Sequence, residues 1–243
     1  MYKVYGTNSI REALINKRVS KLYLLSGYSN EEILSLIKEQ SIPFTYVSRK
    51  ELDGLSNGAV HQGIIGVAKP IKPLSLEELI KRNSEYSSGL LIMLDGLKDP
   101  HNLGAIIRSA DIFNSLGIIY KSRSSVSINE TVEKVSTGAI NYVPLCEVNN
   151  LNHAINKLKE NGYWIVGLDG EAKDELRNLP FDRKLVIIVG SEGEGISHLL
   201  LKNCDYLVKI PMNGHSKINS LNASNACAIA LYEGFINEFR NIK

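Results

Sequence analysis

Three stretches of the chain combine glycine with asparagine, serine or carboxylate side chains, and each follows an apolar run. They span residues 95–104, 190–195 and 210–224. Glycine lets the backbone come close to a ligand, and amide and hydroxyl groups can orient a polar substrate. The first stretch runs on to Arg108, which lies in the helix predicted after it.

Each stretch taken alone is also typical of an ordinary helix start. Asn102 is a good N-cap, Ser220 and Asn222 lie where capping groups are common, and glycines suit a tight turn. Arg108 lies among apolar neighbours, where a solvated side chain is the simpler interpretation. The glycine spacing fits neither a Rossmann fingerprint nor a P-loop, so a nicotinamide-dependent dehydrogenase is disfavoured.

The elements that must position these stretches alternate between apolar strands and amphipathic helices. Strands are predicted at 90–94, 117–120, 142–145, 164–168, 185–189 and 206–210, and helices near 103–115, 130–139, 151–160, 196–203 and 221–239. Such alternation predicts a largely parallel α/β sheet with helices on both faces. Sheets of this kind bind ligands beyond the carboxyl ends of their strands, where the three stretches would lie.

The first part of the chain reads as a smaller α/β unit. Strands are predicted at 21–25, 44–47 and 63–67 and helices at 31–39 and after a capping box that begins at Ser9. Residues 1–75 carry ten Lys and Arg against six Asp and Glu, a net charge of +4, which favours contact with a polyanion. Prolines and serines around a short helix at 76–81 suggest a connection, so we predict domains at 1–72 and 89–243 joined by a linker at 73–88.

Composition narrows the classes of protein further. The start of the chain does not read as a signal peptide, and no apolar run has the length of a membrane span. Cys146, Cys204 and Cys227 are scattered and odd in number, which favours a reducing compartment, and we expect a cytoplasmic protein. Neither Cys-x-x-Cys nor His-x-x-x-His spacing occurs, so no metal site is expected.

Taken in order, the three stretches resemble the three motifs of the SpoU/TrmH family of RNA ribose 2′-O-methyltransferases, which belong to the SPOUT class. The matching residues are Asp-Pro-His-Asn-Leu-Gly-Ala-Ile-Ile-Arg at 99–108, Gly-Ser-Glu-Gly-Glu-Gly-Ile-Ser at 190–197, and Ile-Pro-Met at 210–212 with Ser-Leu-Asn-Ala-Ser at 220–224. Residues 4–14 and 61–64 are similar to the substrate-binding domain of the 23S ribosomal RNA guanosine-2′-O-methyltransferase branch. That domain resembles ribosomal protein L30e in fold.

The resemblance implies a two-domain α/β protein: a small L30e-like domain followed by a parallel-sheet SPOUT domain with a C-terminal trefoil knot. It also implies a homodimer that binds S-adenosylmethionine and methylates RNA, with ribosomal RNA as the expected partner. The backbone around Gly190, Ile210 and Leu221 would contact the cofactor. Among the side chains, Arg108 would stabilise the attacking oxygen, and Asn102, Glu192, Ser220 and Asn222 would orient the substrate and brace the loops.

Other activities share parts of this pattern. A transfer RNA 2′-O-methyltransferase and a ribosome-directed resistance methyltransferase would have the same catalytic motifs, and a non-catalytic assembly factor could retain the fold. The chain departs from the family pattern between Ile210 and Leu221, where His215-Ser216 reads as an insertion. The target nucleotide is not encoded in any motif that we identify.

Overall fold

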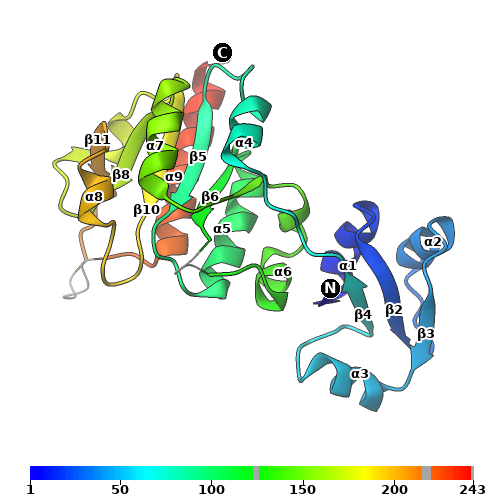
Figure 1. Cartoon of the computed structure of the whole chain (residues 1–243). Coiled ribbons are helices and arrows are strands. Elements are labelled where there is room, and N and C mark those ends of the chain that lie inside the picture. Colours follow the sequence, from blue (N-terminus) through cyan, green and yellow to red (C-terminus); the bar gives the residue numbers. More distant parts are fainter. Residues whose placement is uncertain (123–125, 215–219, 242–243) are drawn as a thin grey trace. The chain divides into compact units, whose positions relative to one another are not determined.

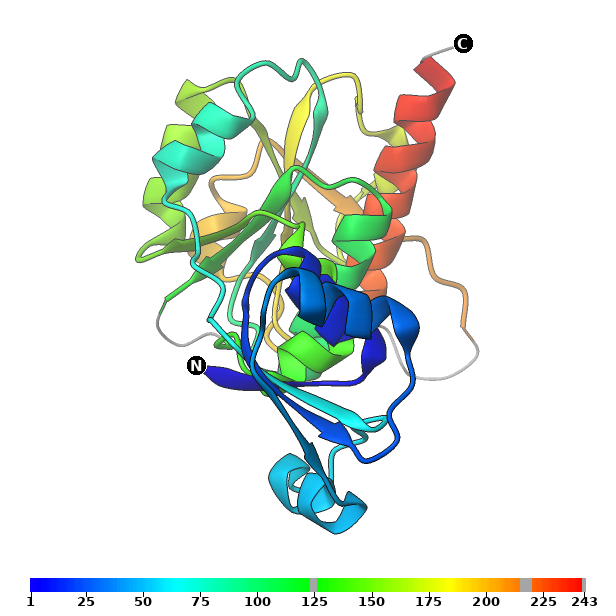
Figure 2. The same cartoon turned by 90° about the vertical axis from the view of Figure 1, so that its right-hand side faces the viewer.

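The alternating strands of the first 72 residues form a four-stranded sheet in the order β1-β4-β2-β3. Its strands are β1 (Tyr2–Tyr5), β2 (Val19–Leu25), β3 (Phe44–Val47) and β4 (Ile64–Ala68). Strand β4 pairs antiparallel with β1 and β2, and β2 pairs parallel with β3. Helices α1 (Thr7–Ile15) and α2 (Glu31–Glu39) pack on one face, and α3 (Arg49–Ser56) packs on the other (Figure 2). The predicted strands and the helix at 31–39 are confirmed, while β1 and α3 were not predicted.

Helix α1 does not begin with the capping box expected at Ser9. It begins at Thr7 after Gly6, whose φ of 84° suits glycine, and no side chain caps it. Ser9 is buried inside the helix. The capping boxes that do form are at Ser48 with Glu51 and at Ser75 with Glu78, and in each the serine accepts a hydrogen bond from the backbone of the glutamate.

The computed structural model describes residues 1–122, 126–214 and 220–241, and these residues divide into two compact units (Figure 1). Unit 1 comprises Met1–Lys72 together with Ile128–Tyr142, and unit 2 comprises Pro73–Ser127 and Val143–Lys243. The second segment of unit 1 contains α6 (Glu130–Ser136) and the short 3-10 helix η1 (Ala139–Asn141). The sequence placed the helix at 130–139 with the C-terminal domain, because the contacts that bind it to unit 1 come from distant residues.

Those contacts are concentrated on two carboxylates of α6. Glu133 has a fully buried side chain and accepts hydrogen bonds from Arg18 and from the Tyr2 hydroxyl. Glu130 accepts from the Tyr5 hydroxyl at 2.9 Å and from a backbone amide of β1 at 3.0 Å. Burial and the neighbouring Glu133 carboxylate raise the pKa of the Tyr2 phenol. Because a buried carboxylate is costly unless it is paired, Arg18 is expected to be essential for this packing.

Unit 2 is built on a seven-stranded, wholly parallel sheet in the order β7-β6-β5-β10-β8-β11-β9. The strands are β5 (Gly89–Leu94), β6 (Gly117–Lys121), β7 (Leu145–Val148), β8 (Trp164–Leu168), β9 (Asp174–Glu175), β10 (Lys184–Val189) and β11 (Tyr206–Lys209). The predicted parallel α/β sheet is confirmed. The strand expected at 142–145 is wrong in its bounds, because Pro144 lacks the amide hydrogen that a sheet ladder uses and the strand begins after it. The trefoil knot and the L30e-like fold of the smaller unit stay predictions.

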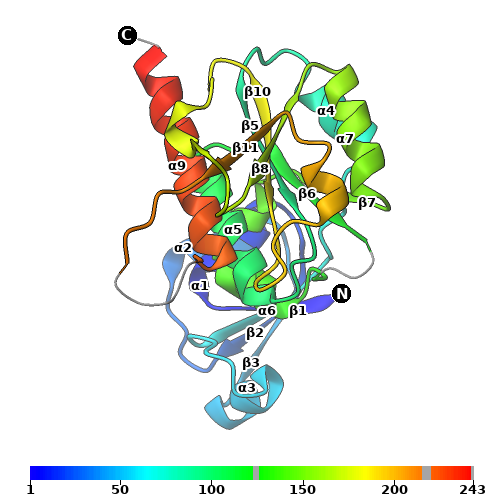
Figure 3. The ribbon, with the colours of Figure 1, turned by 90° about the vertical axis from the view of Figure 1, so that its left-hand side faces the viewer.

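Helices cover both faces of this sheet (Figure 3). Helices α4 (Leu76–Arg82), α7 (Leu151–Glu160) and α8 (His198–Leu201) pack on one face, and α5 (Pro100–Ile112) and α9 (Ala223–Asn241) pack against each other and the opposite face. Residues 73–88, predicted as a linker between the domains, instead contribute side chains to unit 2. Leu76 and Leu79 are buried in the core of unit 2, and Leu74 forms a bridge with Cys146.

The three cysteines are expected to be unreactive in the folded protein. Burial raises the pKa of the Cys146 and Cys227 thiols to about 12 and that of Cys204 to about 11. A thiol is protonated below its pKa, and only the thiolate attacks an alkylating agent. We therefore expect no carbamidomethylation by iodoacetamide at pH 8 in the native protein and modification of all three in urea, as measured by mass spectrometry. Rapid native labelling of Cys227 would contradict this prediction.

Candidate functional site

The strand order of unit 2 places a ligand-binding edge beside β10. Strand β10 lies between β5 and β8 in the sheet. Strands β5, β6 and β7 follow one another on one side of β10, and β8, β9 and β11 lie on its other side, so the direction in which strands are added reverses at β10. In parallel α/β sheets, ligands bind beyond the carboxyl ends of the strands at such a reversal. A pocket of about 870 Å³ lies there, lined by the segments that follow β8, β10 and β11 and by the start of α9.

The predicted cofactor residues Gly190, Ile210 and Leu221 all line this pocket, as do Glu192, Ser220 and Asn222. The other lining residues include apolar side chains from each segment, among them Leu168, Ile196 and Met212. The structure thus brings together six of the eight residues singled out in the sequence. The proposed insertion at His215-Ser216 lies outside the described residues.

The loop after β10 is closed tightly on itself. Ser191 and Gly195 exchange two backbone hydrogen bonds, of 3.1 and 3.0 Å. A Cβ at Gly190 would lie 2.1 Å from the carbonyl carbon of Gly195 and 2.4 Å from the amide nitrogen of Ile196. The glycine at 190 is therefore required by close approach of two backbone segments, and no side-chain rotation could make room for another residue.

A hydrogen-bonded group of three side chains connects the three sequence stretches. The Asn102 amide donates to Glu192 Oε1 at 2.9 Å. The Asn222 amide donates to the same oxygen and to Asn102 Oδ1, the latter at 3.0 Å. Glu192 is thereby held by two amides from helices far apart in the sequence. This three-residue contact, which we call the amide–carboxylate network, fixes the loop after β10 against the starts of α5 and α9.

Asn222 also organises the start of α9. Its Oδ1 accepts from the Ser224 backbone amide at 2.9 Å and from the Ser224 hydroxyl at 2.6 Å. One oxygen therefore caps the helix while the amide hydrogens serve the network. The Asn222 side chain therefore both caps α9 and takes part in the amide–carboxylate network.

Asn102 does not cap its helix, which corrects the sequence interpretation. Helix α5 begins at Pro100, and the N-cap is Asp99, whose carboxylate accepts from the His101 amide at 2.8 Å. Proline is favoured in the first turn because its missing amide hydrogen would have no partner there. Asn102 is consequently inside the first turn, buried, and free to reach Glu192.

Arg108 is not brought to the pocket within this chain. It is six residues beyond Asn102 on α5, about 9 Å along the helix axis at 1.5 Å per residue. Its side chain is exposed, does not line the pocket, and makes no hydrogen bond or ion pair with any residue that the structure describes. Among the described residues, Arg108 is therefore part of neither the pocket lining nor the amide–carboxylate network.

The sequence reasoning missed the loop after β8. Asp169, Gly170 and Glu171 line the pocket although none was singled out. Their position after a predicted strand of the same parallel sheet was the available signal. Together with Glu192 and Glu194 they give the pocket four carboxylates, and its described lining contains no Lys or Arg. This charge favours a ligand with positive groups over a phosphate-rich nucleotide.

Two family models match the chain. The model described as the SpoU rRNA Methylase family matches residues 89–232. The model described as RNA 2′-O ribose methyltransferase substrate binding matches residues 3–74. A Staphylococcus aureus (strain COL) protein assigned to the TrmH family of tRNA/rRNA methyltransferases is 41% identical over 238 residues, which cover 96% of this chain and 94% of that protein.

Solved structures share the fold over nearly the whole chain. The SpoU methyltransferase AviRb from Streptomyces viridochromogenes, in complex with AdoMet, aligns with a TM-score of 0.81 at 23% identity, covering 98% of this chain and 90% of that one. An AdoMet-bound rRNA methyltransferase from Sinorhizobium meliloti aligns with a TM-score of 0.80 at 20% identity, covering 97% and 87%.

No helix of the described residues is both long and apolar enough to cross a bilayer. No group of three or more His, Cys, Asp and Glu side chains is arranged in that part of the chain to hold a metal ion.

Proposed function

This chain belongs to the SpoU rRNA methylase family, and on that premise we propose that it transfers a methyl group from S-adenosylmethionine to a ribose 2′-hydroxyl, most specifically that of a guanosine in 23S ribosomal RNA. Membership confirms the resemblance seen in the three sequence stretches and identifies an RNA methyltransferase. The choice of the ribose hydroxyl is supported by the match of residues 3–74 to a 2′-O ribose substrate-binding family. The observation that carries the proposal is the amide–carboxylate network, which joins Asn102 of the first stretch to Glu192 and Asn222, two residues that line the pocket.

The pocket suits S-adenosylmethionine, the methyl donor of this family and the ligand of two solved relatives. When bound, this cofactor supplies an electrophilic methyl group on a positively charged sulfur. The four carboxylates and the absence of Lys or Arg from the described lining favour a sulfonium and an ammonium group. Apolar side chains from Ile210 and Leu221 suit an adenine ring, and the backbone near Gly190 can come close to the ligand because Gly190 has no side chain.

The side chains of the network would orient the substrate rather than react with it. Glu192 is restrained by two amides, so its second oxygen keeps a defined direction at the pocket edge. Ser220 and Asn222 would form the polar wall beside the methyl group. Such preorganisation lowers the barrier by holding the attacking oxygen in line with the methyl carbon.

Arg108 would act on the RNA. An arginine keeps its proton in proteins, so a role as general base is disfavoured. An exposed guanidinium that has no hydrogen-bond or ion-pair partner among the described residues can stabilise charge on the ribose oxygen and grip a neighbouring phosphate. The homodimer and the cytoplasmic location inferred for the family stay proposals. Exposed Ile112 and Tyr232 on α5 and α9 support a second copy covering the face near Arg108.

Arg108→Lys is expected to lower the rate of methyl transfer about tenfold and to weaken RNA binding, because lysine keeps the charge but loses the planar pair of donors. The melting temperature should stay unchanged, since the Arg108 side chain is exposed and has no hydrogen bond or ion pair with the described part of the chain. Rates would be measured with labelled cofactor and RNA affinity by filter binding. Arg82→Lys, on the exposed end of α4, is the matched control. A variant at Arg108 with the original rate and RNA affinity would refute the role.

Asn222→Asp is expected to lower methyl transfer about a hundredfold, the lower end of the loss caused by removing one preorganised donor from an active site. Aspartate keeps the oxygen that caps α9 but replaces the amide hydrogens with an oxygen facing Glu192. The two carboxylates would repel, and the network would open. Thermal unfolding should change little. Asn150→Asp, which alters a helix cap outside the pocket, should leave the rate unchanged.

Mapping the methylated nucleotide tests the whole proposal. Purified 23S ribosomal RNA and bulk transfer RNA would be incubated with the protein and labelled S-adenosylmethionine, then digested and analysed by mass spectrometry. The expected product is 2′-O-methylguanosine from the ribosomal RNA. Label on transfer RNA alone would favour the related transfer RNA activity, and label on a base would refute ribose methylation.

A further inference from the structure

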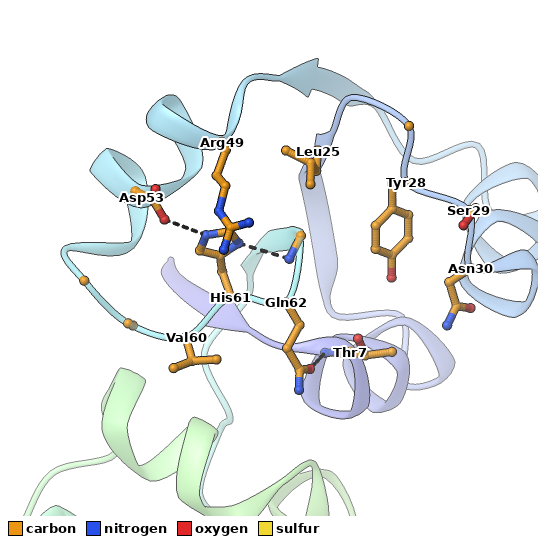
Figure 4. A pocket seen from close by; sticks show the side chains of 14 residues that line it. Thr7, Leu25, Tyr28, Ser29, Asn30, Arg49, Asp53, Val60, His61 and Gln62 are labelled. Carbon is orange, nitrogen blue, oxygen red and sulfur yellow. Dashed lines mark hydrogen bonds and ion pairs between the residues drawn. The ribbon is translucent and has the colours of Figure 1, made fainter.

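Resting on the proposed function, we propose that a pocket in unit 1 binds one unpaired nucleotide of the RNA substrate and places its phosphate at Arg49. The pocket has a volume of about 830 Å³ and lies between the loop that joins β2 to α2 and the loop that joins α3 to β4 (Figure 4). Its lining includes Tyr28 and Asn30 from the first loop, His61 and Gln62 from the second, and Arg49 and Asp53 from α3. It is separate from the cofactor pocket, which belongs to unit 2.

Both loops contain residues with left-handed backbone. Gly27 and Gly58 have φ of +85° and +80°, and a Cβ at either would meet nothing within 4 Å. Gln62 adopts a φ of 52° although it is not glycine, and its Oε1 is fixed by the Thr7 amide at 2.7 Å. Left-handed backbone at a residue other than glycine is often retained at ligand sites, where surrounding bonds hold it in place.

His61 locks the second loop onto α3. Its Nδ1 accepts from the Gly63 amide at 3.0 Å, so the proton is on Nε2, which donates to Asp53 at 2.9 Å (Figure 4). The ring is 8% exposed. Because both ring nitrogens are already used, His61 shapes the wall of the pocket rather than binding a ligand. A preformed wall lowers the entropy lost on binding.

Two side-chain amides in the pocket keep hydrogen-bond donors for a ligand, beside the partly exposed carboxylate of Asp53, which contacts His61 through one oxygen. Asn30 uses its oxygen to cap α2 through the Ile33 amide, and Gln62 uses its oxygen on Thr7, so each amide retains its hydrogens. Arg49 is exposed and forms no hydrogen bond or ion pair with the rest of the described chain. Donors beside a free guanidinium suit the phosphate oxygens and base carbonyls of RNA.

Apolar surface in the same pocket suits the face of a base. Leu25 and the Tyr28 ring line it, and Val60 at the tip of the second loop is 67% exposed. RNA-binding domains recognise single strands by turning bases out and packing them against such side chains. The combination of donors, cation and apolar wall in one preformed hollow therefore matches a single extruded nucleotide.

The first test replaces two neighbouring basic residues, Arg49 and Lys50, one at a time in the full chain. Binding of a fluorescein-labelled hexauridylate would be followed by fluorescence anisotropy at several KCl concentrations. Arg49→Gln should weaken binding about tenfold and reduce the slope of log affinity against log salt by about 0.7, the value for one contact with a single-strand phosphate. Lys50→Gln removes the same charge from the adjacent exposed residue, which does not line the pocket, and should change affinity less than about twofold.

A second pair tests the amide donors. Asn30→Asp keeps the helix-capping oxygen and replaces the free NH₂ group, so it should weaken hexauridylate binding while leaving thermal stability intact. Asn150→Asp makes the equivalent change at the cap of α7 and should leave binding unchanged. In methylation assays, Arg49→Gln and Asn30→Asp should raise KM for RNA and leave kcat and the affinity for S-adenosylmethionine unchanged.

The outcomes separate this proposal from the proposed function. If the wild type methylates ribosomal RNA while Arg49→Gln and Asn30→Asp bind hexauridylate as it does, the pocket proposal is overturned and the activity stands. If the wild type binds hexauridylate through Arg49 but transfers no methyl group to any RNA, the pocket stands and the activity fails. A loss of binding in Lys50→Gln equal to that in Arg49→Gln would also overturn the pocket proposal.

Discussion

Gly190→Ala is expected to weaken S-adenosylmethionine binding about a hundredfold or more and to abolish measurable RNA methylation. A Cβ at this position would overlap the backbone of Gly195 and Ile196, and backbone atoms cannot move aside as a side chain does. Overpacking of this kind costs about 1–3 kcal/mol or more, and each 1.4 kcal/mol lost in binding is about tenfold in affinity. The two hydrogen bonds between Ser191 and Gly195 would have to break for the loop to open.

Isothermal titration calorimetry with S-adenosylmethionine measures this effect directly. Gly54→Ala is the matched control, because its Cβ would meet nothing within 4 Å and it lies in helix α3 of unit 1. Alanine is a better helix former than glycine, so this control should be neutral or slightly stabilising. Wild-type cofactor affinity in Gly190→Ala would show that the loop after β10 does not form the cofactor site.

Arg18→Met is expected to destabilise the protein by about 3–5 kcal/mol, the usual cost of leaving one charge of a buried pair without its partner. Methionine has a similar length but no donors. Glu133 is fully buried and would retain only the Tyr2 hydroxyl, and the backbone oxygen of Lys69 and the side chain of Asn141 would also lose donors. The free energy of unfolding would be measured by urea denaturation.

Two variants show whether the buried charge is the cause. Arg11→Met removes an arginine that is 38% exposed and paired with Glu12 at 2.7 Å, so it should cost no more than about 1 kcal/mol. Adding Glu133→Gln to Arg18→Met removes the stranded charge and should restore part of the stability, with a coupling energy of about 1–3 kcal/mol. If Arg11→Met and Arg18→Met lowered the free energy of unfolding equally, an unpaired buried charge on Glu133 would not be the cause of the loss.

Much of the candidate site could be read from the sequence because its parts are local. A polar, glycine-containing loop after an apolar strand is a short-range pattern, and the parallel order of the strands places such loops at one edge. Gly190, Glu192 and Asn222 are site residues by resemblance to the family's motifs, and all three line the pocket. The cap of α5 was placed wrongly because Asp99 and Asn102 are both good capping residues, and only the position of Pro100 in the first turn separates them.

The division into units could not be read in the same way. The helix at 130–136 follows a strand of the parallel sheet, so alternation alone assigns it to the C-terminal domain. Its attachment to unit 1 depends on Arg18 and Tyr2, more than 110 residues away, which meet Glu133 across the fold. The prolines and serines of residues 73–88 predict a linker, whereas two buried leucines of that segment belong to the core of unit 2.

The sequence by itself determined the family and the parallel α/β sheet, and its motifs contain six residues that line the pocket beside β10, because hydrophobic periodicity and loop motifs depend on neighbouring residues. Only the tertiary structure decided that Asn102, Glu192 and Asn222 share hydrogen bonds, that Arg108 stands apart from them, and that α6 belongs with the N-terminal sheet. These facts depend on which distant side chains meet and which are removed from water. Contacts of that kind are selected by packing of the whole chain, and no local pattern encodes them.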